Sequence, residues 1–179
     1  MVLGVDRIKK LIKGITLVED LGQRDLEDPE GAGLDLRVGE IFEISGETVL
    51  AIEKRKTVDS KSVAKFNPKK SAKFTIKPGE FFLFQTEEKV NLPDYLVATL
   101  HPRSTLLRSG VWPLTTQVAP GYQGTLNVGI KNMGPANFTI ELGARFLHII
   151  FHEVSGKGSM YRGQWQGGRV TTTKEETQV

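Results

Sequence analysis

The sequence predicts a mainly β fold, a jelly-roll-like distorted β-barrel with one short N-terminal helix. Three observations support this prediction. Short apolar stretches separated by turn residues recur from about residue 33 onward, helical spacing of apolar residues is confined to residues 5–13, and the length of 179 residues suits a single core. Many short strands at close spacing, with little helix, are typical of a β-sandwich or barrel.

The predicted helix covers residues 5–13 and is expected to be the only substantial one. Apolar residues recur there at helical spacing, and Asp6 lies near the start. Gly14 follows directly and is a residue at which helices commonly end.

Strand patterns separated by turns occupy the chain from about residue 33 to residue 154. Ser45-Gly46 indicates a hairpin, and Pro78-Gly79 indicates a β-turn. The predicted strands are residues 34–38, 40–44, 48–53, 73–76, 81–90, 92–102, 125–132, 137–142 and 144–154.

We assign residues 1–170 to a single domain, because no linker or internal repeat divides them. The end of the chain, residues 171–179, reads TTTKEETQV and is expected to form a disordered tail.

The composition excludes several classes of protein. The chain has no cysteine, so disulfides are excluded, as are the zinc nucleobase deaminases, which need cysteine ligands. His148 and His152 share one strand face but have no obvious third metal ligand. There is no apolar stretch near the ~20 residues of a membrane helix and no signal peptide, so no membrane contact and a cytoplasmic location are expected.

The charge is uneven although its net value is only +3. Residues 54–73 hold eight Lys or Arg and one acid, Asp59. A solvated loop or exposed hairpin explains this segment, and a surface for polyanions is the alternative. Only Phe66 and Phe74 are near enough to stack on bases, so we do not expect a nucleic-acid partner.

The segment PRSTLLRSG, residues 102–110, has the composition of a phosphate site. Arginine forks match phosphate oxygens, and hydroxyl and backbone N–H groups complete an anion site. The pair Leu106-Leu107 predicts one helical turn anchored in the core. An amphipathic turn whose arginines make surface ion pairs is equally compatible. The candidate ligand-binding residues are Arg103, Ser104, Thr105 and Arg108.

Three further segments are candidates for a site, and each has a purely structural explanation. GAGLDLRVG, residues 31–39, places Asp35 where a loop enters a strand. Residues 119–122, Ala-Pro-Gly-Tyr, fit a type II turn with Tyr122 packed on its corner. Residues 161–170, YRGQWQGGRV, could close over a ligand or form a surface loop.

In this order and spacing, these segments resemble the dCTP deaminase / dUTPase family over nearly the whole chain. The run from FTIKPGE to HPRSTLLRSGV matches the family's strands and its "RSSxxR" phosphate motif. APGYQG resembles its "DxGYxG" turn, and NFTIELGARFLHIIFHEV its "GxRxxQxxF" strand. The helix at the start and YRGQWQGG near the end favour the deaminase branch.

The resemblance implies a jelly-roll-like homotrimer whose sites are shared between subunits and bind dCTP or dUTP. Mg²⁺ would arrive with the triphosphate, and no zinc would take part. Asp35 would lie near the metal–phosphate region or hold its loop, and Tyr161 and Gln166 would close over the nucleotide. By position, Arg103, Ser104 and Arg108 would bind the triphosphate, and Thr115, Thr116 and Gln117 would lie beside the base and sugar. Thr105 and Tyr122 are also expected to be substrate-binding residues.

Two positions depart from the family pattern. Ala119 stands where the turn carries Asp, which orients water or binds the sugar 3′-hydroxyl. Gly129 stands where the deaminases carry the catalytic Glu. General acid–base help contributes typically about 10²–10⁴-fold, so the usual chemistry should be nearly lost, and the catalytic residues are unknown.

Three functions remain open from the sequence. The first is a nucleotide-binding protein without the family chemistry, and the second is an active deaminase or diphosphatase that uses other groups, such as His101, Glu141, His148 or His152. The third is a trimeric scaffold with residues 54–73 as a contact surface.

Overall fold

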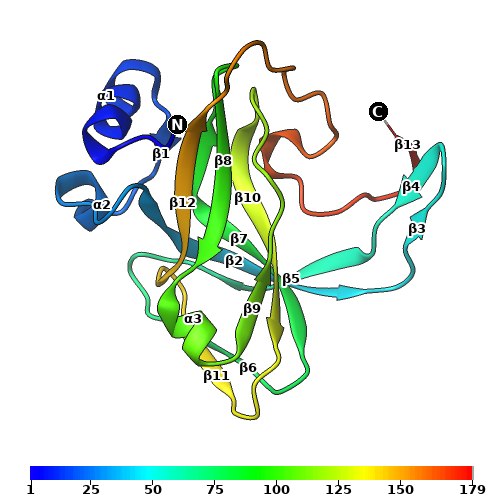
Figure 1. Cartoon of the computed structure of the whole chain (residues 1–179). Coiled ribbons are helices and arrows are strands. Elements are labelled where there is room, and N and C mark those ends of the chain that lie inside the picture. Colours follow the sequence, from blue (N-terminus) through cyan, green and yellow to red (C-terminus); the bar gives the residue numbers. More distant parts are fainter. Residues whose placement is uncertain (179) are drawn as a thin grey trace.

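The computed structural model describes residues 1–178 and confirms the mainly β, barrel-like prediction. The main sheet has the order β8-β12-β2-β7-β10-β9, with β1 beside β7 and β5 beside β2 (Figure 1). Ala98 of β8 and Val118, which follows β9, exchange two backbone hydrogen bonds of 2.9 and 3.0 Å. This bridge brings the two ends of the sheet together, so the barrel is nearly closed.

Thirteen strands are present among the described residues, and most of the predicted ones match within two residues. The strands are β1 (Val18–Glu19), β2 (Leu34–Ser45), β3 (Val49–Leu50), β4 (Lys54–Lys56), β5 (Asp59–Lys65), β6 (Lys73–Ile76), β7 (Phe81–Asn91), β8 (Leu96–Pro102), β9 (Val111–Leu114), β10 (Gln123–Asn132), β11 (Phe138–Glu141), β12 (Arg145–Glu153) and β13 (Glu176–Thr177).

The strand prediction was wrong at Gly39, where two strands were expected. In the structure β2 runs through this glycine without interruption, with a register shift against β7. A Cβ at position 39 would lie 2.8 Å from the backbone nitrogen of Glu87. The glycine therefore permits a close approach of two strands rather than a turn. Strands β1, β4, β5, β9 and β13 were not predicted. The strand expected at residues 48–53 is limited to β3, and β8 begins four residues later than expected.

The predicted N-terminal helix is confirmed as α1 (Val5–Ile15), which buries Ile8 and Leu11. Helix α2 (Gln23–Glu27) and a 3₁₀ turn, η1 (Gln166–Gly168), were not predicted, and a further helix of five residues is α3 (Ser104–Arg108). Helix α3 is the helical turn expected in the phosphate-like segment, but only Leu106 is buried, and Leu107 is exposed. None of the helices in residues 1–178 is long and apolar enough to cross a membrane.

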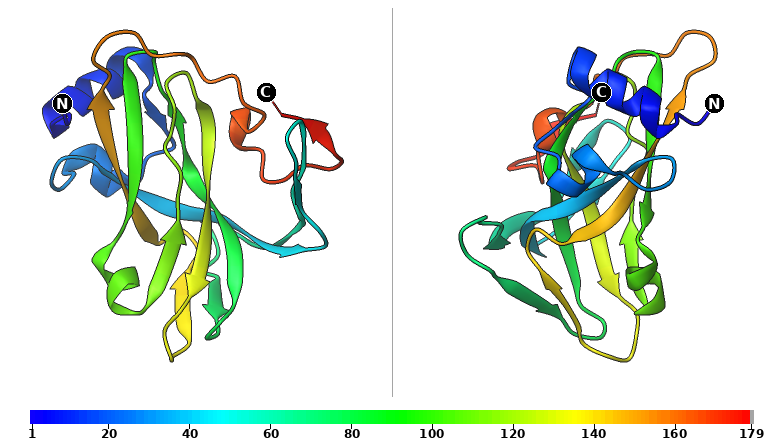
Figure 2. Two further views of the ribbon diagram at one scale, coloured as in Figure 1. Left: turned by 45° about the vertical axis from the view of Figure 1, so that its right-hand side comes forward. Right: turned by 90° about the vertical axis from the view of Figure 1, so that its left-hand side faces the viewer.

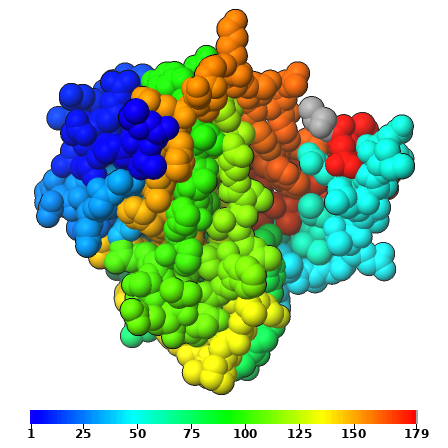
Figure 3. Space-filling model, viewed as in Figure 1, coloured from blue at the N-terminus to red at the C-terminus, as the bar shows by residue number. Residues whose placement is uncertain are grey.

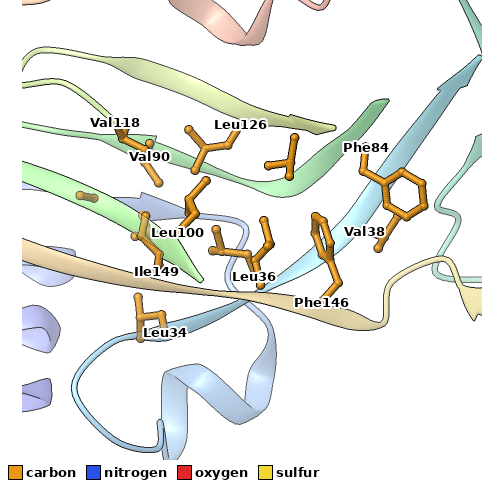
Figure 4. Close-up of a cluster of buried hydrophobic side chains, with 14 of the residues drawn as sticks. Leu34, Leu36, Val38, Phe84, Val90, Leu100, Val118, Leu126, Phe146 and Ile149 are labelled. Carbon is orange, nitrogen blue, oxygen red and sulfur yellow. The ribbon is translucent and has the colours of Figure 1, made fainter. Parts of the chain in front are cut away.

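The core fills the inside of the barrel (Figure 4). Alternate residues of the strands point inward, and Leu36, Phe84 and Phe146 are almost completely buried. Burying a side chain of this size stabilises the fold by about 1.5–3 kcal/mol. The core therefore holds the strand ends, from which the candidate site residues project, in fixed positions.

An arm of residues 46–58 extends from the barrel and carries the end of the chain. The arm holds β3 and β4, and β13 pairs with β4 (Figures 2 and 3). The tail predicted to be disordered, residues 171–179, follows a defined path along the arm over residues 171–178. The backbone N–H of Thr57 donates to the buried Thr172 hydroxyl at 2.9 Å. Val179 lies outside the described residues.

Candidate functional site

A cleft of about 520 Å³ lies between the barrel, the arm and a C-terminal segment, residues 158–171, which we call the strap. We call this cleft the strap pocket. Three of the predicted ligand-binding residues, Gln117, Tyr122 and Tyr161, line it. Its other lining residues are Ile44, Thr48, Thr57, Val58, Phe81, Leu83, Leu100, Thr116, Val118, Ala119, Leu126, Asn127, Trp165, Arg169, Val170 and Thr171.

The turn of residues 119–122 forms one end of the strap pocket. The Tyr122 backbone N–H donates to the Ala119 carbonyl at 3.1 Å, and Gly121 has φ of +77°, as a type II turn requires. The Tyr122 side chain is only 7% exposed, and its hydroxyl donates to the Thr125 carbonyl at 2.6 Å. Burial raises the pKa of Tyr122 to about 12, so this hydroxyl stays protonated at neutral pH.

The strap is bound to this turn through Tyr161 and Gln166. The Tyr161 N–H donates to the Pro120 carbonyl at 2.6 Å, and its ring meets the Tyr122 ring edge-on with centroids 5.5 Å apart. The Gln166 amide donates to the Gly121 carbonyl at 3.0 Å and accepts from the Gln123 N–H at 3.1 Å. Both residues that the sequence assigns to closure therefore hold the strap over the turn.

The two positions that depart from the family pattern lie at this pocket. Ala119 lines it, and Gly129 on β10 lies directly beneath the ring of Phe81, another lining residue. Among the residues described, the lining of the pocket includes no carboxylate and no histidine. Its one charged side chain, Arg169, is ion-paired with Glu176 at 2.5 Å. The aromatic and aliphatic side chains of the lining therefore suit the pocket to binding a ring.

A second cleft, of about 500 Å³, lies beside α2 and contains several arginines. We call it the arginine cleft. Asp35 is buried and is ion-paired with three of the arginines that line this cleft: with Arg103, with Arg145 at 3.0 Å and with Arg24 at 3.3 Å. The Nδ1 atom of His148 lies 2.9 Å from the other Asp35 oxygen. One carboxylate thus holds three guanidinium groups in place.

Burial governs the pKa values in the arginine cleft. It lowers the pKa of Arg103, and the neighbouring charges of Arg145 and Arg24 lower it further. It raises the pKa of Asp25, against the opposing effect of Arg24. Burial also lowers the pKa of His148, in spite of the nearby acids. Cationic groups are thus crowded together here, and the cleft would favour an added anion.

Asp35 does not fit the role of a metal ligand. Its oxygens are occupied by cationic side chains, which would repel a divalent ion. No group of three His, Cys, Asp or Glu residues within residues 1–178 is arranged to hold a metal. Of its two expected roles, the geometry supports the second, holding the loop and the arginines that shape the site.

The predicted phosphate-binding residues do not all lie together. Arg103 lines the arginine cleft, whereas Arg108 lines a separate cleft between α3 and residues 134–139. Ser104 and Thr105 are exposed on α3. None of the four lines the strap pocket, so one chain keeps the predicted phosphate residues apart from Gln117, Tyr122 and Tyr161.

Sequence reasoning missed three residues that the structure places at these clefts. Arg145 lies in the quoted segment GARF and could have been chosen for its charge next to a strand. Arg24 lies in a short helix without periodicity, and nothing in the sequence connects it with Asp35. Phe81 looked like an ordinary strand residue, because only the strand pairing brings it over Gly129.

Comparison with known proteins identifies relatives of the whole chain. Residues 2–154 match the family model described as dCTP deaminase-like. A dCTP deaminase of Pyrobaculum neutrophilum is 34% identical over 176 residues, which cover 96% of this chain and 95% of that one. A Methanothermobacter thermautotrophicus protein named "Probable deoxyuridine 5'-triphosphate nucleotidohydrolase" is 28% identical over 166 residues, covering 93% and 99%.

A solved structure shares the fold. The 2'-deoxycytidine 5'-triphosphate deaminase from Agrobacterium tumefaciens has a TM-score of 0.66 and 17% identity, and the match covers 86% of this chain and 48% of that chain. At this identity the likeness concerns the fold alone. It confirms the arrangement of strands on which the two clefts are built.

Proposed function

This chain belongs to the dCTP deaminase-like family, and on that premise we propose that it binds a pyrimidine deoxynucleoside triphosphate, of the dCTP or dUTP class, without the family's usual acid–base chemistry. The observation that carries this proposal is the strap pocket. It keeps the turn, Tyr122, Tyr161 and the closing Gln166, yet it has Ala119 and Gly129 where the resemblance requires acids.

The separation of the candidate residues supports a shared site between subunits of a homotrimer. In one chain Gln117 and Tyr122 line the strap pocket, while Arg103 and Arg108 line other clefts. A base bound at one subunit would then place its triphosphate near the arginines of another. Trp112 and Leu114 of β9 are 59% and 52% exposed and offer an apolar face for such contact.

Any Mg²⁺ in this proposal would be held by the triphosphate oxygens, because Asp35 is already surrounded by cations. The ion would reduce the charge repulsion within the triphosphate. The arginines of this chain would bind the remaining phosphate oxygens and orient them. A cytoplasmic location remains our expectation from the sequence.

A second candidate is an active dCTP deaminase or dUTP diphosphatase that uses other groups. The observation in its favour is the 34% identity with a relative named dCTP deaminase. Of the side chains considered for this role, His148 lies against Asp35 in the arginine cleft. The Nε2 atoms of His101 and His152 each lie 3.2 Å from the Thr99 hydroxyl. His152 lines a cleft that also includes Gln117, and neither histidine lines the strap pocket.

One pair of measurements tests both candidates. Calorimetry of the purified protein with dCTP and dUTP in the presence of Mg²⁺ should show binding, and Arg103→Ala should weaken it. Product analysis of the same mixtures should show no dUTP, dUMP or pyrophosphate above a blank. If neither dCTP nor dUTP gives a heat of binding, the binding proposal is refuted. Products above the blank would establish the second candidate.

A further inference from the structure

Phe81 occupies the space that a side chain at position 129 would need. It lies on β7 directly opposite Lys131 of β10, and its ring crosses diagonally to Gly129. A Cβ added to Gly129 would lie 2.6 Å from the ring Cζ, 2.8 Å from Cε2 and 3.4 Å from the Leu114 Cβ. Contacts under 3.0 Å require a shift, so a side chain at 129 fits only if the Phe81 ring moves aside.

The backbone does not demand glycine at this position. Gly129 lies within the regular pairing of β10 with β7 and β9, and its φ is not in the left-handed region. A residue with a side chain could adopt this conformation if the Phe81 ring were absent. The absence of an acid here is therefore coupled to the presence of an aromatic ring on the neighbouring strand.

The same ring is part of the wall of the strap pocket, next to Leu83 and Ile44. On this wall the polar side chain of Asn127 is already engaged. The Asn127 amide donates to the carbonyls of Gly168 and Arg169 at 3.1 and 3.2 Å, and its oxygen accepts from Gln85 at 3.1 Å. The wall therefore presents an aromatic and aliphatic surface to a ligand.

We propose that Phe81 determines which ligands the strap pocket accepts, because its side chain stacks on a flat, uncharged ring of the ligand. A side chain at position 129 would otherwise lie in this place and act on the ligand ring. This inference rests on the proposed function, under which the ring is the nucleobase. The pocket holds the base through ring contact, and the phosphates are bound by other residues. Recognition at Phe81 then depends on an aromatic ring and not on a proton transfer.

Calorimetry with two kinds of probe separates ring binding from phosphate binding. The probes are dUTP and inorganic tripolyphosphate, which has the phosphates but no ring. Phe81→Leu keeps an apolar side chain of similar reach and removes the aromatic face. Because stacking of one base on an aromatic residue is measured as about 1–3 kcal/mol, dUTP should bind at least about fivefold more weakly to this variant. Tripolyphosphate binding should not change.

The matched control is Phe82→Leu, which changes the next residue of β7. Phe82 does not line the strap pocket and instead meets the ring of Phe74 edge-on, with centroids 4.9 Å apart. This variant should bind dUTP like the parent protein. A cooperative melting transition in both variants verifies that they are folded, and Phe81→Tyr, which keeps the aromatic face, should retain dUTP binding if Phe81→Leu loses it.

The outcomes distinguish this inference from the proposed function. If the parent binds dUTP and Phe81→Leu binds it equally well, the role of Phe81 is refuted while the nucleotide site stands. The role of Phe81 is also refuted if the parent binds tripolyphosphate as tightly as dUTP, because the base of dUTP then contributes nothing to binding. If the parent binds neither dUTP nor dCTP, the proposed function and this inference fail together.

Discussion

Asp35 and Arg103 form an ion pair that joins the start of β2 to the residue before α3, two segments far apart in the sequence. Arg145 and Arg24 share the same carboxylate. The predicted phosphate-binding arginine is thus positioned by a buried acid, and the two cannot be understood separately.

Asp35→Asn should destabilise the protein strongly, because it removes the buried negative charge with which all three guanidinium groups are ion-paired. Removing one partner of a buried ion pair costs about 3–5 kcal/mol of stability. Because these arginines are partly exposed, we expect a loss of about 3 kcal/mol. The melting temperature should fall by about 6–12 °C. Thermal unfolding followed by circular dichroism measures this. Asp94→Asn, an exposed site, should leave the melting temperature unchanged, and an equal drop in both variants would argue against the network.

Gln166→Ala should loosen the strap without unfolding the barrel. The change removes two hydrogen bonds to the turn, those with Gly121 and Gln123, each contributing about 0.5–1.5 kcal/mol. Hydrogen exchange at the Tyr161 amide should become several-fold faster, while core amides of β2 keep their protection. The same variant should bind dUTP more weakly. Unchanged exchange at Tyr161 would show that the strap is held elsewhere.

Gly129→Ala should destabilise the parent protein by about 1–3 kcal/mol, the usual cost of overpacking. In a Phe81→Ala background the same substitution should destabilise the protein much less. The ring is the atom group that a new Cβ would meet. Urea unfolding of the four proteins in this cycle measures the coupling. Additive effects of the two substitutions would contradict the contact.

A glutamate restored at position 129 would need the space that the Phe81 ring occupies. Ala119→Asp with Gly129→Glu should remain inactive toward dCTP and dUTP, because Phe81 blocks the new glutamate. Adding Phe81→Ala should allow some product to form if the scaffold is a disarmed family enzyme. Product analysis of the double and triple variants decides this. Activity in the double variant would show that the ring moves aside readily.

The raised pKa of Tyr122, about 12, predicts a loss of stability in alkali. The folded state disfavours ionisation of the Tyr122 hydroxyl. The protonated hydroxyl therefore contributes fully to the stability of the fold below pH 10, and this contribution is lost as the pH rises from 10 to about 12. The difference amounts to about 2–3 kcal/mol. In an absorbance titration at alkaline pH, Tyr122→Phe should remove the ionisation near pH 12. The control Tyr95→Phe, at an exposed site, should retain it.

Local patterns in the sequence determined the class of the fold, the N-terminal helix, most strands and the turn at residues 119–122. These features depend on residues close together in the chain, whose periodicity and turn chemistry can be read directly. The collinear motifs also determined the family and the absence of acids at Ala119 and Gly129.

Only the tertiary structure decided what surrounds those positions. Strand pairing between β7 and β10 sets the Phe81 ring over Gly129, and the strap reaches the turn through Gln166 from more than forty residues away. The convergence of Arg24, Arg103 and Arg145 on Asp35 likewise joins four separate segments. Such contacts depend on the register of strands and on burial, which single-sequence patterns do not contain, so the chemistry of the two clefts could be known only once the chain was folded.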